Sequence, residues 1–495
     1  MCLGATRPIT DPKRAIVVGA GPGGLLAAIH LLRRGDYHVT IVDPGRDYAA
    51  VDDLASHRSW MIGLANHGIS AIREVPGLWD YVARIGVPLD AFSVYLGTKE
   101  MKQNLNDVPE EIKAGAEGYL VDRNYVVAAL AKFIGDEFSV GTGRYQPRYG
   151  SRALYVDERQ QRVLVRNEHS EEEEYLGYDL LIGADGIRSV VRNAILLNHR
   201  DFECRVDDIF NNFKAVHVRR PAAVGAGQMT VLPQSMPNLN GIALPEKGDM
   251  LCLTFGYQLH EPCDNELMSE DPKVVAKYVK EHFKAYELVD YDDFAEQWCS
   301  QNWNNTGQVH CNTYHSSKLS CLILGDAAHA TSPSIGMGMN TALADASVLS
   351  RLIEEHGADN PKAFLPAFSE ERVKEGQALT DLAFYLFSFN TRQQVRYLVE
   401  GGVRNFLHKF FPSYIHPDPQ AAIGMGKKLS EVYDMSKKMG IIDSVHDTND
   451  KVRRDYWEKR WGMVSNKDER MGTFGKVAVV SSILAASAGA IAANL

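Results

Sequence analysis

Several features that would place this chain in a familiar class are missing from its 495 residues. Its seven cysteines are an odd number and include no C-x-x-C pair, so we expect neither a disulfide framework nor a zinc site, and a reducing compartment fits best. Acidic residues outnumber basic ones by 63 to 53, and no basic stripe is present, which disfavours nucleic-acid binding. The N-terminal stretch "MCLGATRPITDPK" has no apolar core, which argues against a secretory signal.

A dinucleotide-binding pattern occupies residues 14–44, "RAIVVGAGPGGLLAAIHLLRRGDYHVTIVDP". A β-branched run precedes Gly19, Gly21 and Gly24 in the spacing G-x-G-x-x-G, a helical apolar pattern follows, and a second β-branched run ends in Asp43. The glycines let the backbone approach a pyrophosphate at a helix N-terminus, and Asp43 is placed to accept hydrogen bonds from a ribose. The pattern predicts a dinucleotide site. The glycines alone do not separate FAD from NAD(P), and their N-terminal position mildly favours FAD.

Two later strand ends also carry glycine and aspartate. "YDLLIGADG" is typical of a buried strand followed by Asp185–Gly186. "CLILGDAAHATSPSIGMGMN" predicts a strand that ends before Asp326, a loop through Pro333 and Gly338, and a helix that begins near Asn340. Such a loop can aim backbone N–H groups at the electron-rich edge of a reduced flavin.

Two side chains near these segments have more than one interpretation. Arg123 opens a helix predicted over 121–134, where a cation opposes the helix dipole, so we expect either an external anionic partner or a surface salt bridge. His329 lies between two alanines of the third glycine-bearing segment. A structural or flavin-packing role is favoured there over that of a catalytic base.

The pattern of strands and helices predicts a discontinuous dinucleotide-binding domain over 14–85, 100–200 and 315–360. Strands broken by proline and glycine indicate an antiparallel sheet over 86–99 and 205–314. A helical region rich in tyrosine and phenylalanine follows over 361–470. No internal repeat is present.

The C-terminal residues 477–495 carry no charge, and their 19 positions approach the roughly 20 that cross a bilayer. Lys467, Arg470 and Lys476 precede this run and would keep the main body on the cytosolic side. We expect a membrane tail; the alternative is a buried or frayed alanine-rich terminal helix.

Three motifs, taken in order and spacing, resemble the single-component FAD-dependent aromatic hydroxylases, the class of para-hydroxybenzoate hydroxylase. These motifs are "GAGPGG" with Asp43, "DLLIGADGIRSVVR" and "LGDAAHATSPSIGMGMNTALADASVL". Within that class "HRSWMIGLANHGISAI", "GVPL" and "FLHKFFPSYIHP" are similar to segments of the kynurenine 3-monooxygenases, with a looser match in the last third. The resemblance implies an α/β fold: an FAD-binding Rossmann-like domain of the GR2 type, an antiparallel-sheet substrate domain and a helical C-terminal part.

The resemblance also implies which residues hold FAD. The first glycines would surround the pyrophosphate, Asp43 would bind the adenosine ribose and Asp326 the ribityl chain, and the backbone after Gly338 would face the flavin ring. Asp185–Gly186 would serve FAD and NADPH together, which accounts for the lack of a second G-x-G-x-x-G. The implied cofactor-binding residues are Gly19, Gly21, Gly24, Asp43, Arg58, Arg123, Asp185, Gly186, Asp326, Gly338, Met339 and Asn340.

The implied reaction is a monooxygenation that consumes NADPH and O2. NADPH reduces bound FAD, O2 adds at flavin C4a to give a hydroperoxide, and the distal oxygen passes to a small aromatic substrate, as in the conversion of L-kynurenine to 3-hydroxykynurenine. The protein excludes water and orients the substrate. No metal is implied. Tyr385, Asn340 and Pro333 are the candidates to act near the reacting ring.

The sequence departs from the kynurenine-type pattern at the substrate carboxylate. Those enzymes place an arginine shortly after the Gly-x-Pro segment, whereas Asp90 and Phe92 occupy this stretch here. Tyr95 and Lys99 are the nearest polar substitutes, and a flexible lysine does not reproduce a bidentate guanidinium grip. The substrate-contact candidates are therefore Tyr95, Lys99 and Tyr385, and a less polar aromatic or prenylated substrate is an alternative to L-kynurenine.

Three functions follow from these observations. The first is a membrane-anchored monooxygenase like the kynurenine 3-monooxygenases, facing the cytosol from the mitochondrial outer membrane or the endoplasmic reticulum. The second is a flavin hydroxylase or epoxidase of a lipophilic secondary metabolite or quinone precursor. The third is a non-catalytic binding protein like the GDP-dissociation inhibitors and Rab escort proteins, against which the intact loop with Pro333, Gly336 and Gly338 argues.

Overall fold

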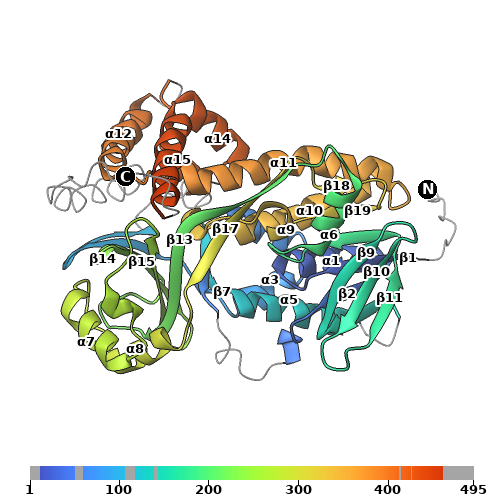
Figure 1. The fold of residues 1–495 in the computed structure, drawn as a ribbon, viewed down its shortest axis with the longest axis horizontal. Coiled ribbons are helices and arrows are strands. Elements are labelled where there is room, and N and C mark those ends of the chain that lie inside the picture. The colour runs from blue at the N-terminus through green and yellow to red at the C-terminus, as the bar shows by residue number, and fades with distance from the viewer. Residues whose placement is uncertain are drawn as a thin grey trace, which may run out of the picture.

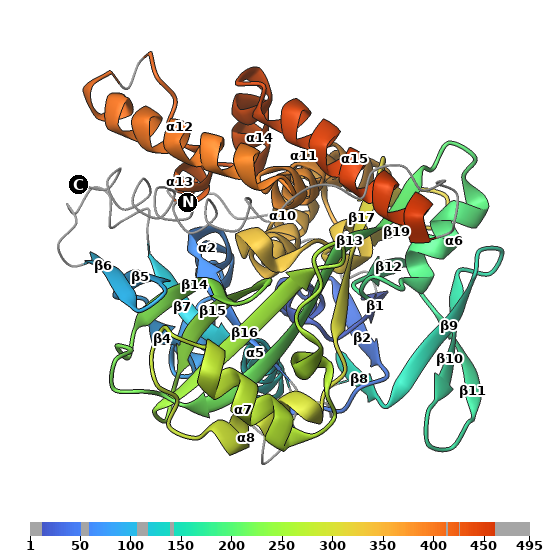
Figure 2. The same ribbon diagram turned by 60° about the vertical axis from the view of Figure 1, so that its left-hand side comes forward.

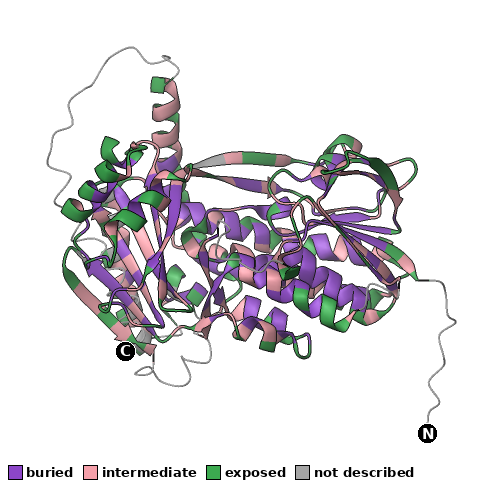
Figure 3. Ribbon diagram, turned by 90° about the horizontal axis from the view of Figure 1, so that it is seen from below, coloured by how far each residue is buried: buried purple, intermediate pink, exposed green. Residues whose placement is uncertain are grey.

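A computed structural model of the protein describes residues 12–50, 59–105, 117–138, 143–411, 414–424 and 426–460. Figure 1 shows two sheet-based parts side by side, with the C-terminal helices along the top of both. Figure 3 shows that buried residues concentrate in the sheets and in the helices packed on them, while exposed residues lie at the rims. The predicted α/β class, with a dinucleotide-binding part, an antiparallel-sheet part and a helical C-terminal part, is confirmed.

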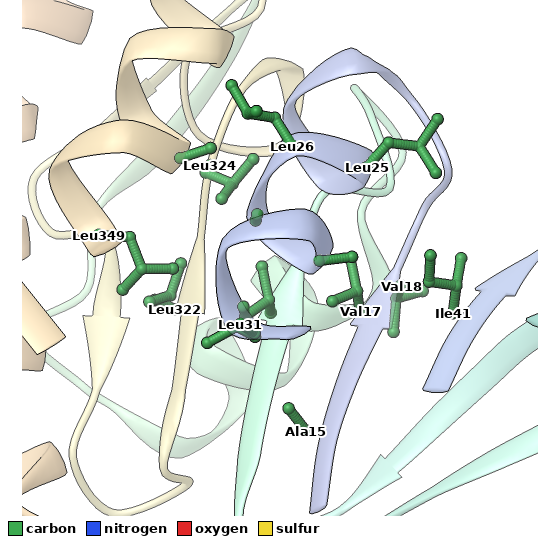
Figure 4. Packing of buried hydrophobic residues seen from close by; sticks show 14 of the residues in the cluster. Ala15, Val17, Val18, Leu25, Leu26, Leu31, Ile41, Leu322, Leu324 and Leu349 are labelled. Carbon is green, nitrogen blue, oxygen red and sulfur yellow. The ribbon is translucent and has the colours of Figure 1, made fainter. Parts of the chain in front are cut away.

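The first part is built on a six-stranded sheet in the order β18-β19-β12-β1-β2-β8. Its strands are β1 (Lys13–Val18), β2 (Tyr37–Asp43), β8 (Tyr145–Tyr149), β12 (Leu180–Gly183), β18 (His315–Ser316) and β19 (Cys321–Ile323). All pairings from β19 to β8 are parallel. Their apolar runs are buried because elements pack on the sheet, as Figure 4 shows for Val17, Leu25, Leu31 and Leu322.

Helices surround this sheet. Proline starts α1 where no N–H is needed, and Gly35 ends it in the left-handed conformation at φ 82°. α1 packs against α10 and α5, and α6 packs against β9 and β12. The elements are α1 (Pro22–Arg34), α2 (Asn66–Arg73), α3 (Leu78–Ala83), α5 (Arg123–Glu137), α6 (Val190–Asn198), α9 (Asp326–His329), α10 (Gly338–His356), and the meander β9 (Ser151–Asp157), β10 (Arg162–Asn167) and β11 (Glu173–Gly177).

The second part is a seven-stranded sheet in the order β17-β13-β16-β15-β14-β5-β6. Side chains alternate between its faces: Leu251, Leu253 and Phe255 pack under α7 and α8, whereas Cys252 packs on the other face against the small sheet β3-β7-β4. The hairpin β5–β6 carries this sheet to Asn104, past the predicted boundary at residue 99, because β6 pairs along the whole of β5. The elements are β3 (Met61–Ala65), β4 (Val87–Pro88), β5 (Ala91–Leu96), β6 (Lys99–Asn104), β7 (Gly118–Asp122), β13 (Cys204–Arg219), β14 (Gln228–Met236), β15 (Leu239–Glu246), β16 (Met250–Gln258), β17 (Asn304–Cys311), α7 (Pro272–His282) and α8 (Tyr291–Cys299).

The C-terminal helices form a third layer over both sheets (Figure 2). They are α11 (Pro361–Tyr385), α12 (Thr391–Phe410), α13 (Pro419–Gly424), α14 (Leu429–Lys438) and α15 (Ile441–Arg460). Within the described part of the chain, every helix is too short or too polar to cross a bilayer. The predicted tail at 477–495 and the predicted cofactor residue Arg58 lie outside the described residues.

One glycine of α11 lets two buried rings approach the helix. A Cβ at Gly376 would lie 2.0 Å from the hydroxyl of Tyr314 and 3.0 Å from Cβ of His329. Both rings are 1% exposed, so neither can swing away into solvent. The third layer therefore depends on a glycine at this position.

We predict that Gly376→Ala lowers the free energy of unfolding by about 1–3 kcal/mol through overpacking. Gly135→Ala in α5 is the matched control, because its Cβ would meet no atom within 4 Å and alanine is the better helix former. Urea denaturation of both variants measures the difference. Equal effects at the two positions would contradict the close approach.

Candidate active site

Three glycine-bearing turns, which we call the first, second and third corners, follow β1, β12 and β19 and lie at one edge of the six-stranded sheet. β19, β12, β1 and β2 are neighbours and run parallel, so their carboxyl ends point the same way. The corners after β1, β12 and β19 therefore lie next to one another, with Asp43 at the end of β2. Crevices at the carboxyl edge of such sheets are where ligands bind.

The glycines of the first corner serve different purposes. A Cβ at Gly19, which has φ 104°, would lie 2.1 Å from the carbonyl oxygen of Ala184, and one at Gly24 would lie 2.1 Å from that of Gly19. These two glycines are required by the packing of the backbone itself. A Cβ at Gly21, the residue that caps α1, would meet no protein atom within 4 Å. Gly21 thus faces open space at a helix N-terminus, where an anionic group is stabilised.

Asp43 holds the first corner in place. One carboxylate oxygen accepts a hydrogen bond from the N–H of Ala20 and the other accepts one from the N–H of Gly45, both at 2.7 Å. The sequence predicted a ribose contact for this carboxylate. The structure adds a bond from β2 to the glycine loop, which the sequence pattern did not reveal.

The second corner is bound to the third through a buried arginine. Asp185 accepts hydrogen bonds from the N–H of Val190 at 2.6 Å and so caps α6, and burial raises the pKa of its carboxyl group. Gly186, at φ 74°, faces open space. Arg192 donates to the carbonyl of Ile187 at 2.5 Å and to that of Ala327 at 2.8 Å. Sequence reasoning gave Arg192 no role, although it lies within the second motif.

At the third corner one carboxylate is exposed and another is buried. Asp326 begins α9 with an exposed side chain and makes no hydrogen bond to a described residue, which suits a ligand contact. His329 is 1% exposed, and its Nε2 lies 2.6 Å from Oδ2 of Asp345. Asp345 also accepts from the N–H of Gly325 at 2.9 Å and from Arg372 at 2.7 Å. His329 therefore has the structural role favoured from the sequence.

Charge compensation keeps Asp345 ionised inside the protein. Burial opposes its ionisation, but His329 and Arg372 hold the pKa of its carboxyl group at about 2. Removing one partner from a buried pair of this kind costs about 3–5 kcal/mol, because it leaves an uncompensated charge. The third corner is thus fixed to α10 and α11.

The side chain of Asn340 is fully occupied by the backbone. Its oxygen accepts from the N–H of Ala65 at 2.8 Å, and its nitrogen donates to the carbonyls of Gly63 at 2.9 Å and Gly336 at 3.0 Å. The amide therefore positions the loop against β3, and only the Asn340 backbone is left for a cofactor. Gly338 and Met339 form the first turn of α10, and Pro333 is exposed on a short 3-10 turn.

Arg123 is exposed at the start of α5, with its guanidinium carbon 5.7 Å from the centroid of the Trp60 ring. Its side chain makes no salt bridge with any residue in the described ranges. An external anionic partner and a surface salt bridge therefore both stay predictions for Arg123.

The substrate-contact candidates do not lie together. Tyr95 is 6% exposed and packs against Tyr286, 5.4 Å between ring centroids, on the α7 side of the seven-stranded sheet. Lys99 is exposed at the start of β6, and in Figure 2 the strands β5 and β6 lie on the opposite side of the molecule from β1 and β2. Neither is brought to the three corners. The alternation of β5 instead turns Phe92, paired with Met229, to the opposite face of the sheet.

Tyr385 lies behind the third corner. It ends α11 at 7% exposure, with its ring 4.7 Å from that of His446, and burial raises the pKa of its hydroxyl. It shares an apolar cluster with Met337 of the glycine-rich loop. The structure therefore supports a packing role for Tyr385 and places it next to the loop.

A further residue near the site was missed by sequence reasoning. His217 of β13 lies with Nδ1 2.7 Å from Glu246 and with Nε2 3.1 Å from the carbonyl of Ser59, the residue after Arg58. Ser59 in turn donates to Asp122, which caps α5. Burial opposes the imidazolium, but Glu246 raises the pKa of His217 above its usual value. This chain of contacts joins the seven-stranded sheet to the start of α5. No local sequence motif predicts it.

The chain was compared with known families once this geometry was established. A family model described as an FAD binding domain matches residues 13–383. The chain belongs to the FAD binding domain family. The predicted FAD-dependent monooxygenase and its FAD cofactor are thereby confirmed at the level of the family.

Several known proteins are similar to this chain over most of its length. Violacein synthase of Chromobacterium violaceum is 27% identical over 85% of this chain and 95% of its own length. Kynurenine 3-monooxygenase of Cryptococcus neoformans is 25% identical over 83% and 85%. Among solved structures, Pseudomonas aeruginosa PqsL in complex with 2-aminobenzoylacetate covers 76% of this chain and 96% of its own, with a TM-score of 0.59 at 21% identity. Klebsiella pneumoniae HpxO with FAD and uric acid covers 88% and 96%, with a TM-score of 0.56 at 20% identity.

Substitutions at two glycines of the first corner should affect different properties, the stability of the apoprotein at Gly24 and cofactor binding at Gly21. We predict that Gly21→Ala leaves the stability of the apoprotein within about 0.5 kcal/mol of the parent, since its φ of −73° suits alanine, but weakens FAD binding at least about 10-fold. Gly24→Ala is the contrast, because its Cβ would meet a backbone oxygen and should lower the melting temperature of the apoprotein itself. Flavin fluorescence titration and thermal melts measure the two effects. Unchanged FAD affinity in Gly21→Ala would show that this space is not the cofactor site.

Proposed function

We propose that this flavoprotein is an NADPH-consuming monooxygenase that hydroxylates an uncharged aromatic substrate. The observation that carries the proposal is the convergence of three glycine-bearing corners on one sheet edge, with open space at Gly21 and Gly186. Asp326 at the third corner has an exposed carboxylate, and Arg123 at the start of α5 has an exposed guanidinium. These groups fit the polar parts of a dinucleotide.

The residues present fit FAD in a defined order. Gly21 and the first turn of α1 would receive the pyrophosphate with Arg123, Asp43 the adenosine ribose, and Asp326 the ribityl chain. The backbone from Gly338 to Asn340 would donate to the flavin ring. When bound, FAD accepts hydride from NADPH and activates O2.

The protein's own contacts fix the positions of the loops that would surround the cofactor. Asn340 fixes the loop through backbone contacts, and Arg192 holds the second corner to the third. On the face of the seven-stranded sheet turned toward β3 and β7, Ala215, Leu244 and Cys252 pack with Met61 of β3 and Leu120 of β7. The pair His217–Glu246 lies on the same face and ties it to Ser59.

The substrate proposal depends on charge. Kynurenine-type enzymes hold the substrate carboxylate with an arginine after the Gly-x-Pro segment, whereas Asp90 is an exposed carboxylate there and Phe92 is apolar. A carboxylate would repel a carboxylate-bearing substrate. These residues, with the similarity to violacein synthase, support an uncharged aromatic substrate over L-kynurenine, which remains the second candidate because of the kynurenine 3-monooxygenase relatives.

We predict that neutral aromatic compounds accelerate NADPH consumption by the purified yellow protein at least about 10-fold, and that L-kynurenine does so less. Stopped-flow absorbance of the flavin, without and then with O2, measures reduction and oxygen use separately. A larger response to L-kynurenine would return the assignment to the kynurenine 3-monooxygenase reaction. Failure of NADPH to reduce the flavin with every compound would favour a non-catalytic binding protein.

We also propose that this enzyme works at a membrane surface. Four residues on one side of α12, Val399, Val403, Phe406 and Phe410, are between 51% and 63% exposed, and we call them the α12 stripe. Large apolar side chains in such a row are unusual on a water-facing helix. Exposed Arg396 lies on the same helix, where it pairs with Glu400 at 2.7 Å, and the row suits the acyl boundary of a bilayer. The charge-free run at 477–495 would add a second attachment.

We predict that the triple change Val403→Ser, Phe406→Ser and Phe410→Ser lowers binding of the full chain to phosphatidylserine-containing vesicles about 10-fold. The change is made in the parent and in a chain carrying Leu484→Lys and Ile491→Lys, which charge the C-terminal run. Tyr155→Ser with Leu197→Ser, exposed elsewhere, is the matched control. Unchanged sedimentation in both backgrounds would refute the membrane contact, and a change in oligomeric state would assign the α12 stripe to a second copy.

A further inference from the structure

Two free cysteines face each other across neighbouring strands. Cys204 begins β13 and Cys311 ends β17, and the antiparallel register pairs them directly. The N–H of Asn312 donates to the carbonyl of Glu203 at 3.1 Å, so the cysteines occupy the adjacent, non-hydrogen-bonded position. Facing Cα atoms there lie about 4.5 Å apart, within the roughly 4.4–6.8 Å that a disulfide spans. The two thiols can therefore be joined without moving the strands.

The two thiols differ in access and in acidity. Cys204 is half-buried and lies between exposed residues, whereas Cys311 is 1% exposed. A hydrogen bond from Cys311 and the charge of Arg192 lower the pKa of Cys204 to about 6, against the effect of burial. The same hydrogen bond, together with burial, raises the pKa of Cys311. Cys204 is thus the more accessible and the more acidic thiol of the pair.

We propose that Cys204 and Cys311 form a peroxide-sensitive dithiol that closes to a disulfide. The sulfur of Cys204 attacks one oxygen of hydrogen peroxide, an S–O bond forms as the O–O bond breaks, and the released hydroxide leaves as water after taking a proton. The sulfur of Cys311 then attacks that of Cys204, and the second hydroxide leaves with the Cys311 proton as water. Two thiols and one peroxide become one disulfide and two waters, with two electrons passed from sulfur to oxygen.

The dithiol lies beside the cofactor edge. Arg192, which lowers the pKa of Cys204, also donates to the carbonyl of Ala327 in the third corner. Two residues before Cys311, the N–H of Val309 donates to the carbonyl of Ala330 at 2.9 Å. Peroxide formed when O2 is reduced without substrate hydroxylation would be released close to these thiols. Only this peroxide source rests on the proposed function; the dithiol itself does not.

The test uses the reduced holoprotein exposed briefly to added hydrogen peroxide and then blocked with N-ethylmaleimide. We expect non-reducing peptide mass spectrometry to find the segments of Cys204 and Cys311 joined, and the melting temperature to rise by several degrees until dithiothreitol reverses it. In Cys311→Ser, Cys204 should stop at the sulfenic acid, which dimedone traps. In Cys204→Ser, Cys311 should stay reduced.

Cys299 is the matched control, since it is also half-buried but burial raises its pKa and its thiol donates to the carbonyl of Ser269. Oxidation of Cys299 as fast as Cys204, or no joined peptide at any peroxide dose, would overturn the proposal. A parallel sample receives NADPH and O2 without an aromatic substrate. If added peroxide joins the cysteines but NADPH does not, the dithiol stands and the flavin is not its source of peroxide.

Discussion

Parallel pairing of four short strands is the constraint on which the rest of the molecule depends. β19, β12, β1 and β2 come from distant parts of the sequence, yet their shared direction brings four strand ends to one edge. Three of these ends then turn sharply, because Gly19, Gly186 and Gly325 adopt positive φ angles. Open space at Gly21 and the exposed carboxylate at Asp326 follow from this geometry.

Buried charged side chains, Asp345 and Arg192, fix the positions of the second and third corners. Asp345 is fully enclosed, and its cost is offset by His329, Arg372 and one backbone N–H, so that three elements are tied at one carboxylate. Arg192 similarly spans two corners through carbonyl oxygens. Such contacts specify one arrangement of loops that contain few large side chains, and they leave the cofactor edge rigid before any ligand arrives.

The sequence predicted the three corners but did not predict which side chains of the seven-stranded sheet face the cofactor part. Glycine spacing, β-branched runs and a terminal acid are local signals, so the first corner, the fold class and the family could be predicted from the sequence. Tyr95 was chosen as a polar side chain near the right segment, but alternation in β5 turns it toward Tyr286, and only the assembled sheet shows which face meets the cofactor part. Asn340 was predicted as a candidate near the reacting ring, whereas its amide bonds the backbone of β3, a partner far away in the sequence. The contact of His217 with Ser59 joins residues 158 positions apart, and no local pattern in the sequence indicated it.

The length of β13 has a consequence for how this architecture can be recombined. This strand of 16 residues runs from the seven-stranded sheet to the cofactor part, and β17 accompanies it for much of that length. Neither half could be excised or grafted onto a related scaffold without severing both ribbons. Exchange of substrate preference between such enzymes must therefore proceed by changing side chains within the sheet. A chimera cut between the two sheets would lose the pairing of β13 with β17.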